Sequence, residues 1–194
     1  MPRAVHRVRI LCAILRGPRE ELAESGKHEQ EMPAITVDRY DLEILSELQR
    51  NGRVTNVDLA DAVGLSASPC LMRVRRLEKA GYIAGYGAQI ELKKLGDTMT
   101  IFTEVTLSDH RAPDFARFEA CIRKVDEIIE CHLVSGGYDY LLKFVTRSIQ
   151  DYQDTIERLL GLSIGIEKYF SYVVIKTIFM KQFYPIEKFF AEDE

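Results

Sequence analysis

Arginine side chains recur within residues 66–80, in a segment that also contains small hydroxyl residues. Arg73, Arg75 and Arg76 occur within four positions, and Lys79 follows them. A guanidinium group can bind guanine through two hydrogen bonds, and serine hydroxyls or helix N-terminal amides can bind phosphate. Although the net charge of the chain is −4, we interpret this locally basic segment as a DNA-binding element.

Two helices joined by a tight turn would hold such a segment in the major groove of DNA. Asn56 can begin a helix that Gly64 ends, and Ser66 can begin a second helix that ends at Ala80–Gly81. This helix-turn-helix spans residues 56–80. The side chains expected to face DNA are Ser66, Ser68, Pro69, Met72, Arg73, Arg75 and Arg76.

An earlier helix and a small hairpin complete the predicted DNA-binding domain. Asp38 can begin a helix that ends near Asn51–Gly52, and the segments Tyr82–Ala84 and Gln89–Leu92 can form a hairpin across Gly85 and Gly87. The inward positions expected in the three helices are Leu42, Leu45 and Leu48 with Ile44 on their flank, then Val57, Leu59, Ala60 and Val63, then Leu71, Val74 and Leu77.

The second half of the chain alternates strands and helices. Strands are expected over residues 100–107, 128–134, 140–146 and 168–179, and helices over residues 114–125 and 151–160. The order βαββαβ is that of a ferredoxin-like domain. The predicted fold class is therefore α+β, with a winged helix-turn-helix domain over residues 35–96 followed by a ferredoxin-like effector and oligomerisation domain over residues 97–194.

Residues 1–34 differ from the rest in composition. They combine five arginines, a short apolar stretch and a charged run. We expect an N-terminal extension without a fold of its own, or a start assigned upstream of Met32.

A paired-glycine turn is the most informative feature of the second half. Gly136 and Gly137 can leave backbone N–H groups open to a carboxylate, and Asp139 can balance an ammonium group. That pair of charges suits a free α-amino acid. The same residues are also compatible with an ordinary hairpin turn in which Asp139 caps its own backbone.

Both halves resemble the Lrp/AsnC family of leucine-responsive, or feast/famine, transcriptional regulators. The segment GLSASPCLMRVRRLEKAGYI (Gly64–Ile83) is similar to the family's recognition segment, and ECHLVSGGYDYLLK (Glu130–Lys143) and SYVVIK (Ser171–Lys176) are similar to its second domain. The resemblance covers residues 35–181 in order and is closest to the leucine-responsive branch.

The resemblance implies amino-acid binding at an interface between subunits. The positions that it links to the effector are Leu133, Gly136, Asp139, Ile149, Tyr172, Val173 and Val174, with Gly137 in the same turn. At Gly137 the leucine-responsive branch often has an acid, so the loss of that charge puts leucine itself in doubt as the effector. Control of amino-acid metabolism is the implied role.

The segment Tyr169–Phe179 is apolar at successive positions, which predicts burial of both its faces. One face would pack on helices and the other on the sheet of a second subunit. The resemblance likewise implies dimers that assemble into larger oligomers such as octamers. One DNA-binding element carries little charge, so paired elements on a dimer are expected to be necessary.

Other chemistry finds little support in the sequence. The four cysteines Cys12, Cys70, Cys121 and Cys131 lack metal-ligand or disulfide spacing, and no apolar run reaches membrane-spanning length. We expect no metal, no cofactor, no catalysis and a cytoplasmic, nucleoid-associated protein. Two alternatives share parts of the pattern: a sirohaem decarboxylase, by resemblance in the two-domain plan, and an architectural protein that bends DNA.

Overall fold

The computed structural model describes residues 35–190, and these form two units. One unit contains Glu91–Thr177, and the other contains residues 35–90 together with residues 178–190. The sequence placed residues 97–194 in a single domain, whereas the described C-terminal segment groups with the helix-turn-helix. The extension expected over residues 1–34 lies outside the described residues.

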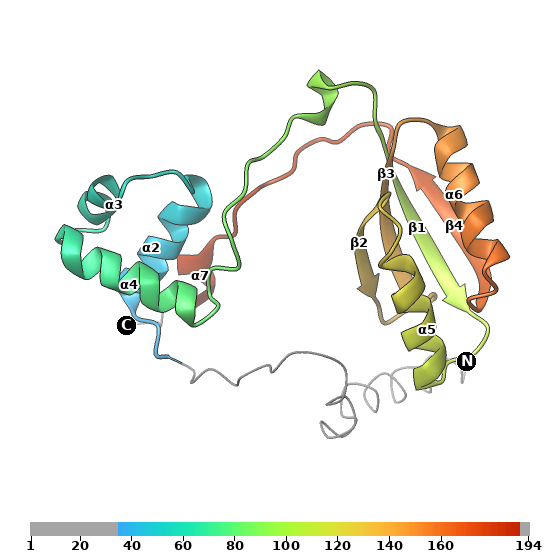
Figure 1. Ribbon diagram of the computed structural model, residues 1–194, viewed down its shortest axis with the longest axis horizontal. Helices are drawn as coiled ribbons and strands as arrows, with labels where there is room; N and C mark the ends of the chain where they lie inside the picture. Colours follow the sequence, from blue (N-terminus) through green and yellow to red (C-terminus); the bar gives the residue numbers. More distant parts are fainter. Residues whose placement is uncertain (1–34, 191–194) are drawn as a thin grey trace. The chain divides into compact units, whose positions relative to one another are not determined.

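The helix-turn-helix unit consists of α2 (Arg39–Arg50), α3 (Asn56–Ala62) and α4 (Ala67–Lys79), with the short α7 (Ile186–Phe190) packed on α2 (Figure 1). All three predicted helices are confirmed. Asp38 begins α2 as expected, because its carboxylate accepts a hydrogen bond from the N–H of Asp41. The expected cap of α3 was one residue late, since Thr55 accepts from the N–H of Asp58.

The core of this unit differs in part from the predicted inward positions. Ile44, which the sequence placed on the flank of α2, is completely buried. On α3, Val57 was expected inward but is 59% exposed, and on α4 the buried position is Cys70 rather than the exposed Leu71. Periodicity fixes the spacing of an apolar stripe, but packing decides which of two neighbouring stripes turns inward. The buried core residues are Ile44, Leu59, Ala60, Val63, Cys70 and Leu77.

Glycines end both helices of the helix-turn-helix through the same backbone geometry. Gly64 and Gly81 have φ values of 67° and 76°, a region that side chains disfavour. After Gly64, the N–H of Leu65 donates to the carbonyl of Ala60 at 2.9 Å. After Gly81, the N–H of Tyr82 donates to the carbonyl of Leu77 at 3.0 Å. Both are Schellman motifs, and they fix the direction in which the chain leaves each helix.

The hairpin expected after α4 is absent as a pair of strands. Between α4 and the first strand, the only regular element is a 3₁₀ turn at Leu92–Lys94. Ile83 packs on the core, whereas Ile90 is exposed. A two-stranded hairpin without further support is marginally stable, and no described strand lies beside this segment as a third.

The second unit is a four-stranded antiparallel sheet with two helices, the predicted ferredoxin-like arrangement. Its strands lie in the order β2-β3-β1-β4. The elements in chain order are β1 (Met99–Leu107), α5 (Ala112–Ile122), β2 (Ile128–Leu133), β3 (Tyr140–Thr146), α6 (Ile149–Gly161) and β4 (Ile166–Val173). The predicted elements are confirmed, with shifts of a few residues at most ends, except that β4 ends well before its predicted end.

Both helices pack against one face of this sheet (Figure 1). Alternate residues of β1 and β3 point to that face and are buried, among them Ile101, Val105 and Leu142. Phe118 of α5 and Leu159 of α6 complete the core. Among residues 35–190, no helix covers the opposite face of the sheet, so that face has no partner within the described part of the chain.

The last strand departs from its prediction in length and burial. β4 ends at Val173, although a strand was expected to continue to residue 179. It is an edge strand, and Phe170 and Tyr172 are 57% and 52% exposed. Even Tyr169, on the helix-covered side, is exposed, because the two helices cover mainly β1 and β3. The helix-covered side of β4 is therefore less buried than expected, and the predicted burial of its other face against a second subunit stays a prediction.

The corrected core of the helix-turn-helix unit gives a direct test. Replacing Ile44 with Ala should lower the free energy of unfolding by about 2–5 kcal/mol, because the side chain is wholly enclosed. Val57→Ala on α3 is the matched control and should change it by less than about 0.5 kcal/mol. Urea denaturation followed by circular dichroism measures both; equal losses would contradict the described packing.

Candidate DNA interface and effector site

The second helix of the helix-turn-helix, α4, is held at its N-terminal end by α3. The side-chain amide of Asn56 donates to the carbonyl of Ala67 at 2.8 Å, which joins the first turn of α3 to the first turn of α4. Leu65, in the turn between the helices, packs on the core as expected. Ser66 precedes α4, but its hydroxyl accepts no capping hydrogen bond and stays exposed.

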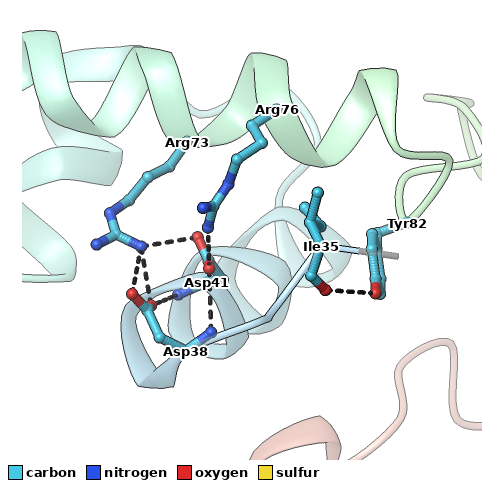
Figure 2. Close-up of polar contacts among 6 residues, drawn as sticks. All are labelled: Ile35, Asp38, Asp41, Arg73, Arg76 and Tyr82. Carbon is cyan, nitrogen blue, oxygen red and sulfur yellow. Dashed lines mark hydrogen bonds and ion pairs between the residues drawn. The ribbon is translucent and has the colours of Figure 1, made fainter. Parts of the chain in front are cut away.

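Along its length, α4 is held against α2 by a cluster of opposite charges (Figure 2). Arg73 Nη1 donates to both carboxylate oxygens of Asp38 at 2.8 Å and to Asp41 Oδ1 at 2.9 Å. Arg76 Nη2 donates to the other oxygen of Asp41. The backbone N–H of Asp38 also donates to Asp41, closing a capping box at the start of α2.

Asp41 is the centre of this cluster because its side chain is completely buried. A buried carboxylate is costly unless several donors bind it, and here two guanidinium groups and one backbone N–H do so. The hydrogen bond that Arg73 donates to the carboxylate of Asp38 raises the pKa of Arg73. Burial raises the pKa of Asp38, but hydrogen bonds and the charge of Arg73 outweigh burial and hold that pKa below its ordinary value of 3.8.

Two of the arginines expected to contact DNA therefore bind acids of their own chain. The Arg73 side chain is 26% exposed and also lies over the ring of Tyr40, 5.5 Å from its centre. The Arg76 side chain remains 43% exposed, so part of its guanidinium group is open to solvent. Helical periodicity predicted that both side chains lie on the outer face of α4. In the structure they turn toward the start of α2 and bind Asp38 and Asp41.

The solvent-facing stripe of α4 consists of residues three or four positions apart. Ser68, Met72, Arg75 and Lys79 are all exposed and share one side of the helix, opposite the buried Cys70. Among the residues that the structure describes, neither Arg75 nor Lys79 forms an ion pair with an acid. Pro69 is exposed beside this stripe. Lys79 was not among the expected DNA-facing residues, although its spacing from Arg75 could have indicated it.

In the second unit, Asp139 lies at the end of the paired-glycine turn and is 7% exposed. Its Oδ2 accepts the backbone N–H of Leu107 at 2.8 Å, and its own N–H donates to the carbonyl of Val105. Its two oxygens also lie 3.1 and 3.0 Å from Nε2 of His110. The carboxylate thus fixes the turn to the end of β1. Sequence reasoning missed His110, because only the fold brings it to Asp139.

The glycines of this turn leave space beside the backbone. Gly136 and Gly137 are exposed, and neither has a positive φ. A Cβ added at either position would meet no atom of the described chain within 4 Å. Neither glycine is therefore required by the backbone of the protomer, and the turn is open to close approach by another molecule.

The expected effector residues form two groups in one protomer. Leu133 and Asp139 flank the turn at one end of the paired strands β2 and β3. Ile149 begins α6 after the other end of β3, and Val174 bonds there through its N–H to the carbonyl of Thr100. Tyr172 and Val173 pair with β1 near that same end. Six residue steps along β3 separate the two ends, about 20 Å at about 3.3 Å per residue.

Comparison with known proteins identifies both units. Residues 37–84 match a family model for a winged helix-turn-helix DNA-binding domain, and residues 100–182 match the model for the Lrp/AsnC ligand binding domain. The transcriptional regulatory protein DoeX of Halomonas elongata is 49% identical over 144 residues, which cover 74% of this chain and 91% of DoeX. The chain belongs to the Lrp/AsnC family.

Further proteins are similar to this chain over about three quarters of its length. The leucine-responsive regulatory protein of Salmonella typhimurium is 44% identical over 147 residues, covering 75% of this chain and 89% of that protein. The solved complex of the transcriptional regulator NMB0573 of Neisseria meningitidis with L-Met has a TM-score of 0.74 and 31% identity, covering 79% and 99% of the two chains. E. coli AsnC has a TM-score of 0.69 and 26% identity, covering 76% and 97%.

The family assignment settles the class of function. The chain is a DNA-binding transcriptional regulator with an Lrp/AsnC ligand-binding domain, and its relatives are regulators rather than enzymes. The sirohaem decarboxylase alternative does not hold. No helix in the described part of the chain is long and apolar enough to cross a membrane.

The buried carboxylate that orients α4 can be tested by substitution. Asp41→Asn keeps the side-chain volume but removes the charge that binds Arg73 and Arg76, so we expect a loss of about 1–3 kcal/mol in the free energy of unfolding. Asp61→Asn, at an exposed position of α3, is the control and should be nearly neutral. A neutral Asp41→Asn in urea denaturation would show that the cluster contributes nothing to stability.

Proposed function

We propose that this chain is a homo-oligomeric transcriptional regulator that binds operator DNA through paired α4 helices and responds to a free amino acid bound between subunits. The solvent-facing stripe of α4 supports the DNA-binding part of the proposal. Arg75 and Lys79 project from a helix whose orientation the Asp41 cluster fixes. In a dimer, each of the two α4 helices would provide two exposed cations for phosphate and base contacts.

We assign distinct contacts to the candidate DNA-facing residues. Arg75 would contact a base edge, and Lys79 would contact phosphate. Ser66, Ser68 and the first amides of α4 would bind the backbone phosphates near the helix N-terminus. Arg73 and Arg76 would act mainly by holding α4 on α2, with the exposed part of Arg76 able to contact phosphate. Pro69 and Met72 would contact apolar groups in the groove.

The separation of the two effector groups supports a site made by two subunits. Gly136, Gly137 and Asp139 lie about one strand length, about 20 Å, from Ile149 and Val174 in the same protomer. One amino acid is too small to contact both groups within a chain. A second copy, placed so that its Ile149 group meets the turn of the first, would bring both groups to one ligand. The apolar Phe170 and Tyr172 on the uncovered sheet face favour such assembly.

The same proposal gives residues 35–96 the DNA-binding role and residues 97–194 the effector and assembly role. A dimer would present two α4 helices, and further association of dimers, up to an octamer, would complete the effector sites. We place the protein in the cytoplasm on the nucleoid, where it would control genes of amino-acid metabolism. The L-Met complex of the Neisseria regulator makes methionine one candidate among the amino acids to test.

DNA recognition through Arg75 predicts a selective loss of affinity. Arg75→Ala should weaken binding to the operator and relax the preference at one base position by about 1–3 kcal/mol, with the unfolding free energy unchanged. Arg111→Ala, which removes an exposed charge from the other unit, is the control. Fluorescence anisotropy with operator and random DNA measures both. An equal loss on the two DNAs would favour the architectural, DNA-bending alternative.

Effector binding predicts stabilisation by at least one of the twenty amino acids. A ligand at a hundred times its Kd stabilises the native state by about 2.7 kcal/mol, which thermal denaturation detects. Gly136→Ala should reduce that response while leaving the unliganded protein stable, because a Cβ there meets no described atom. Absence of stabilisation across the whole panel would overturn the effector part of the proposal and leave the DNA-binding part standing.

A further inference from the structure

Residues of α5 and of the edge strand β2 line a groove on the helix-covered side of the sheet. Its volume is about 440 Å³, within the range of about 300–1,000 Å³ for pockets that bind small molecules. Its apolar wall comes from Ile122, Ile128, Ile129 and Leu133. Ile129 and Leu133 remain 52% and 37% exposed, so this wall is only partly covered in the protomer.

Two opposite charges, one on α5 and one at its C-terminal cap, line the same groove without pairing with each other. Glu119 and Arg123 are four positions apart, a spacing at which a carboxylate and a guanidinium group commonly form an ion pair on a helix. Here Oε1 of Glu119 accepts the hydroxyl of Tyr140 at 2.7 Å instead. Among the described residues, Arg123 binds no acid. The groove thus has a separated negative and positive group beside an apolar wall.

The buried tyrosine keeps the negative group in place. Burial and the neighbouring Glu119 raise the pKa of Tyr140 well above its usual range, so its hydroxyl stays protonated and remains a donor. No donor from the described residues binds the second oxygen of Glu119. Arg123 follows the last residue of α5, where the helix dipole favours a cation. The dipole therefore stabilises the charge of Arg123 even when no ligand is bound.

We infer that this groove binds a free α-amino acid with an apolar side chain, as a site additional to the one proposed between subunits. Glu119 would accept the ammonium group, Arg123 would bind the carboxylate through its planar fork, and the apolar side chain would lie along Ile122 and Ile128. The charges of the ligand would thereby complete the ion pairs that Glu119 and Arg123 do not make with each other. All of these groups come from one protomer, so the site does not depend on assembly.

The reactivity of the Cys131 thiol can report whether the groove is occupied. It lines the groove, and burial raises the pKa of its thiol to about 11, with the charge of Glu119 acting in the same direction. Alkylation of this thiol should therefore be slow but measurable by peptide mass spectrometry. An amino acid in the groove would cover it, and at ten times its Kd should slow alkylation of Cys131 by about tenfold.

The experiment measures alkylation of Cys131 in the full chain with leucine, methionine, isoleucine, valine and phenylalanine, with glutamate and lysine as polar comparisons. We expect protection by at least one apolar amino acid only. Arg123→Gln should raise the amino-acid concentration needed for half protection by about tenfold. Glu119→Gln should raise it similarly while keeping an acceptor for Tyr140. Lys124→Gln, which removes the neighbouring exposed cation that does not line the groove, should leave protection unchanged.

The outcomes separate this inference from the proposed effector site. Protection of Cys131 that survives Gly136→Ala but is lost in Arg123→Gln supports the groove, whether or not the site between subunits exists. Thermal stabilisation by an amino acid without protection of Cys131 overturns the groove and leaves the proposed function intact. Protection that depends on protein concentration but not on any amino acid would show that a second copy covers the groove, which also overturns the inference.

Discussion

The buried carboxylate of Asp41 is the interaction on which the DNA-binding unit depends. It takes donors from its own helix start and from two arginines of α4, so one group fixes both the beginning of α2 and the orientation of the recognition helix. A carboxylate in this position is tolerable only while every donor is present. The basic residues of α4 therefore form two groups: Arg73 and Arg76 bind the acids at the start of α2, and Arg75 and Lys79 stay exposed to solvent.

The second unit combines a well-filled core with surfaces that one protomer leaves open. Its two helices bury one face of the sheet, while Phe170 and Tyr172 lie exposed on the other face at the edge strand. At one end of the sheet, Asp139 is bound by Leu107 and His110, which stiffens the turn without filling the space beside its glycines. A rigid turn next to open space is a suitable place for a ligand and a second subunit to meet.

Much of the architecture could be predicted from the sequence. Helix caps and stops such as Asp38, Gly64 and Gly81 depend on local backbone chemistry, and they were located within a residue or two. The βαββαβ order followed from the alternation of apolar patterns, and β3 was found at Tyr140–Thr146 as expected. The end of β4 was misjudged because apolar residues such as Ile175, Ile178 and Phe179 recur up to residue 179 whether or not a neighbouring strand is there to pair with them.

The sequence by itself determined the order of the elements, the place of the helix-turn-helix and its concentration of positive charge, because these follow from local spacing. Only the tertiary structure decided which arginines remain available. Asp41 lies more than thirty positions before Arg73 and Arg76, and no local pattern indicates that its buried side chain would bind both. The same holds for His110 beside Asp139 and for Tyr140 beside Glu119, since packing alone brings these distant residues together.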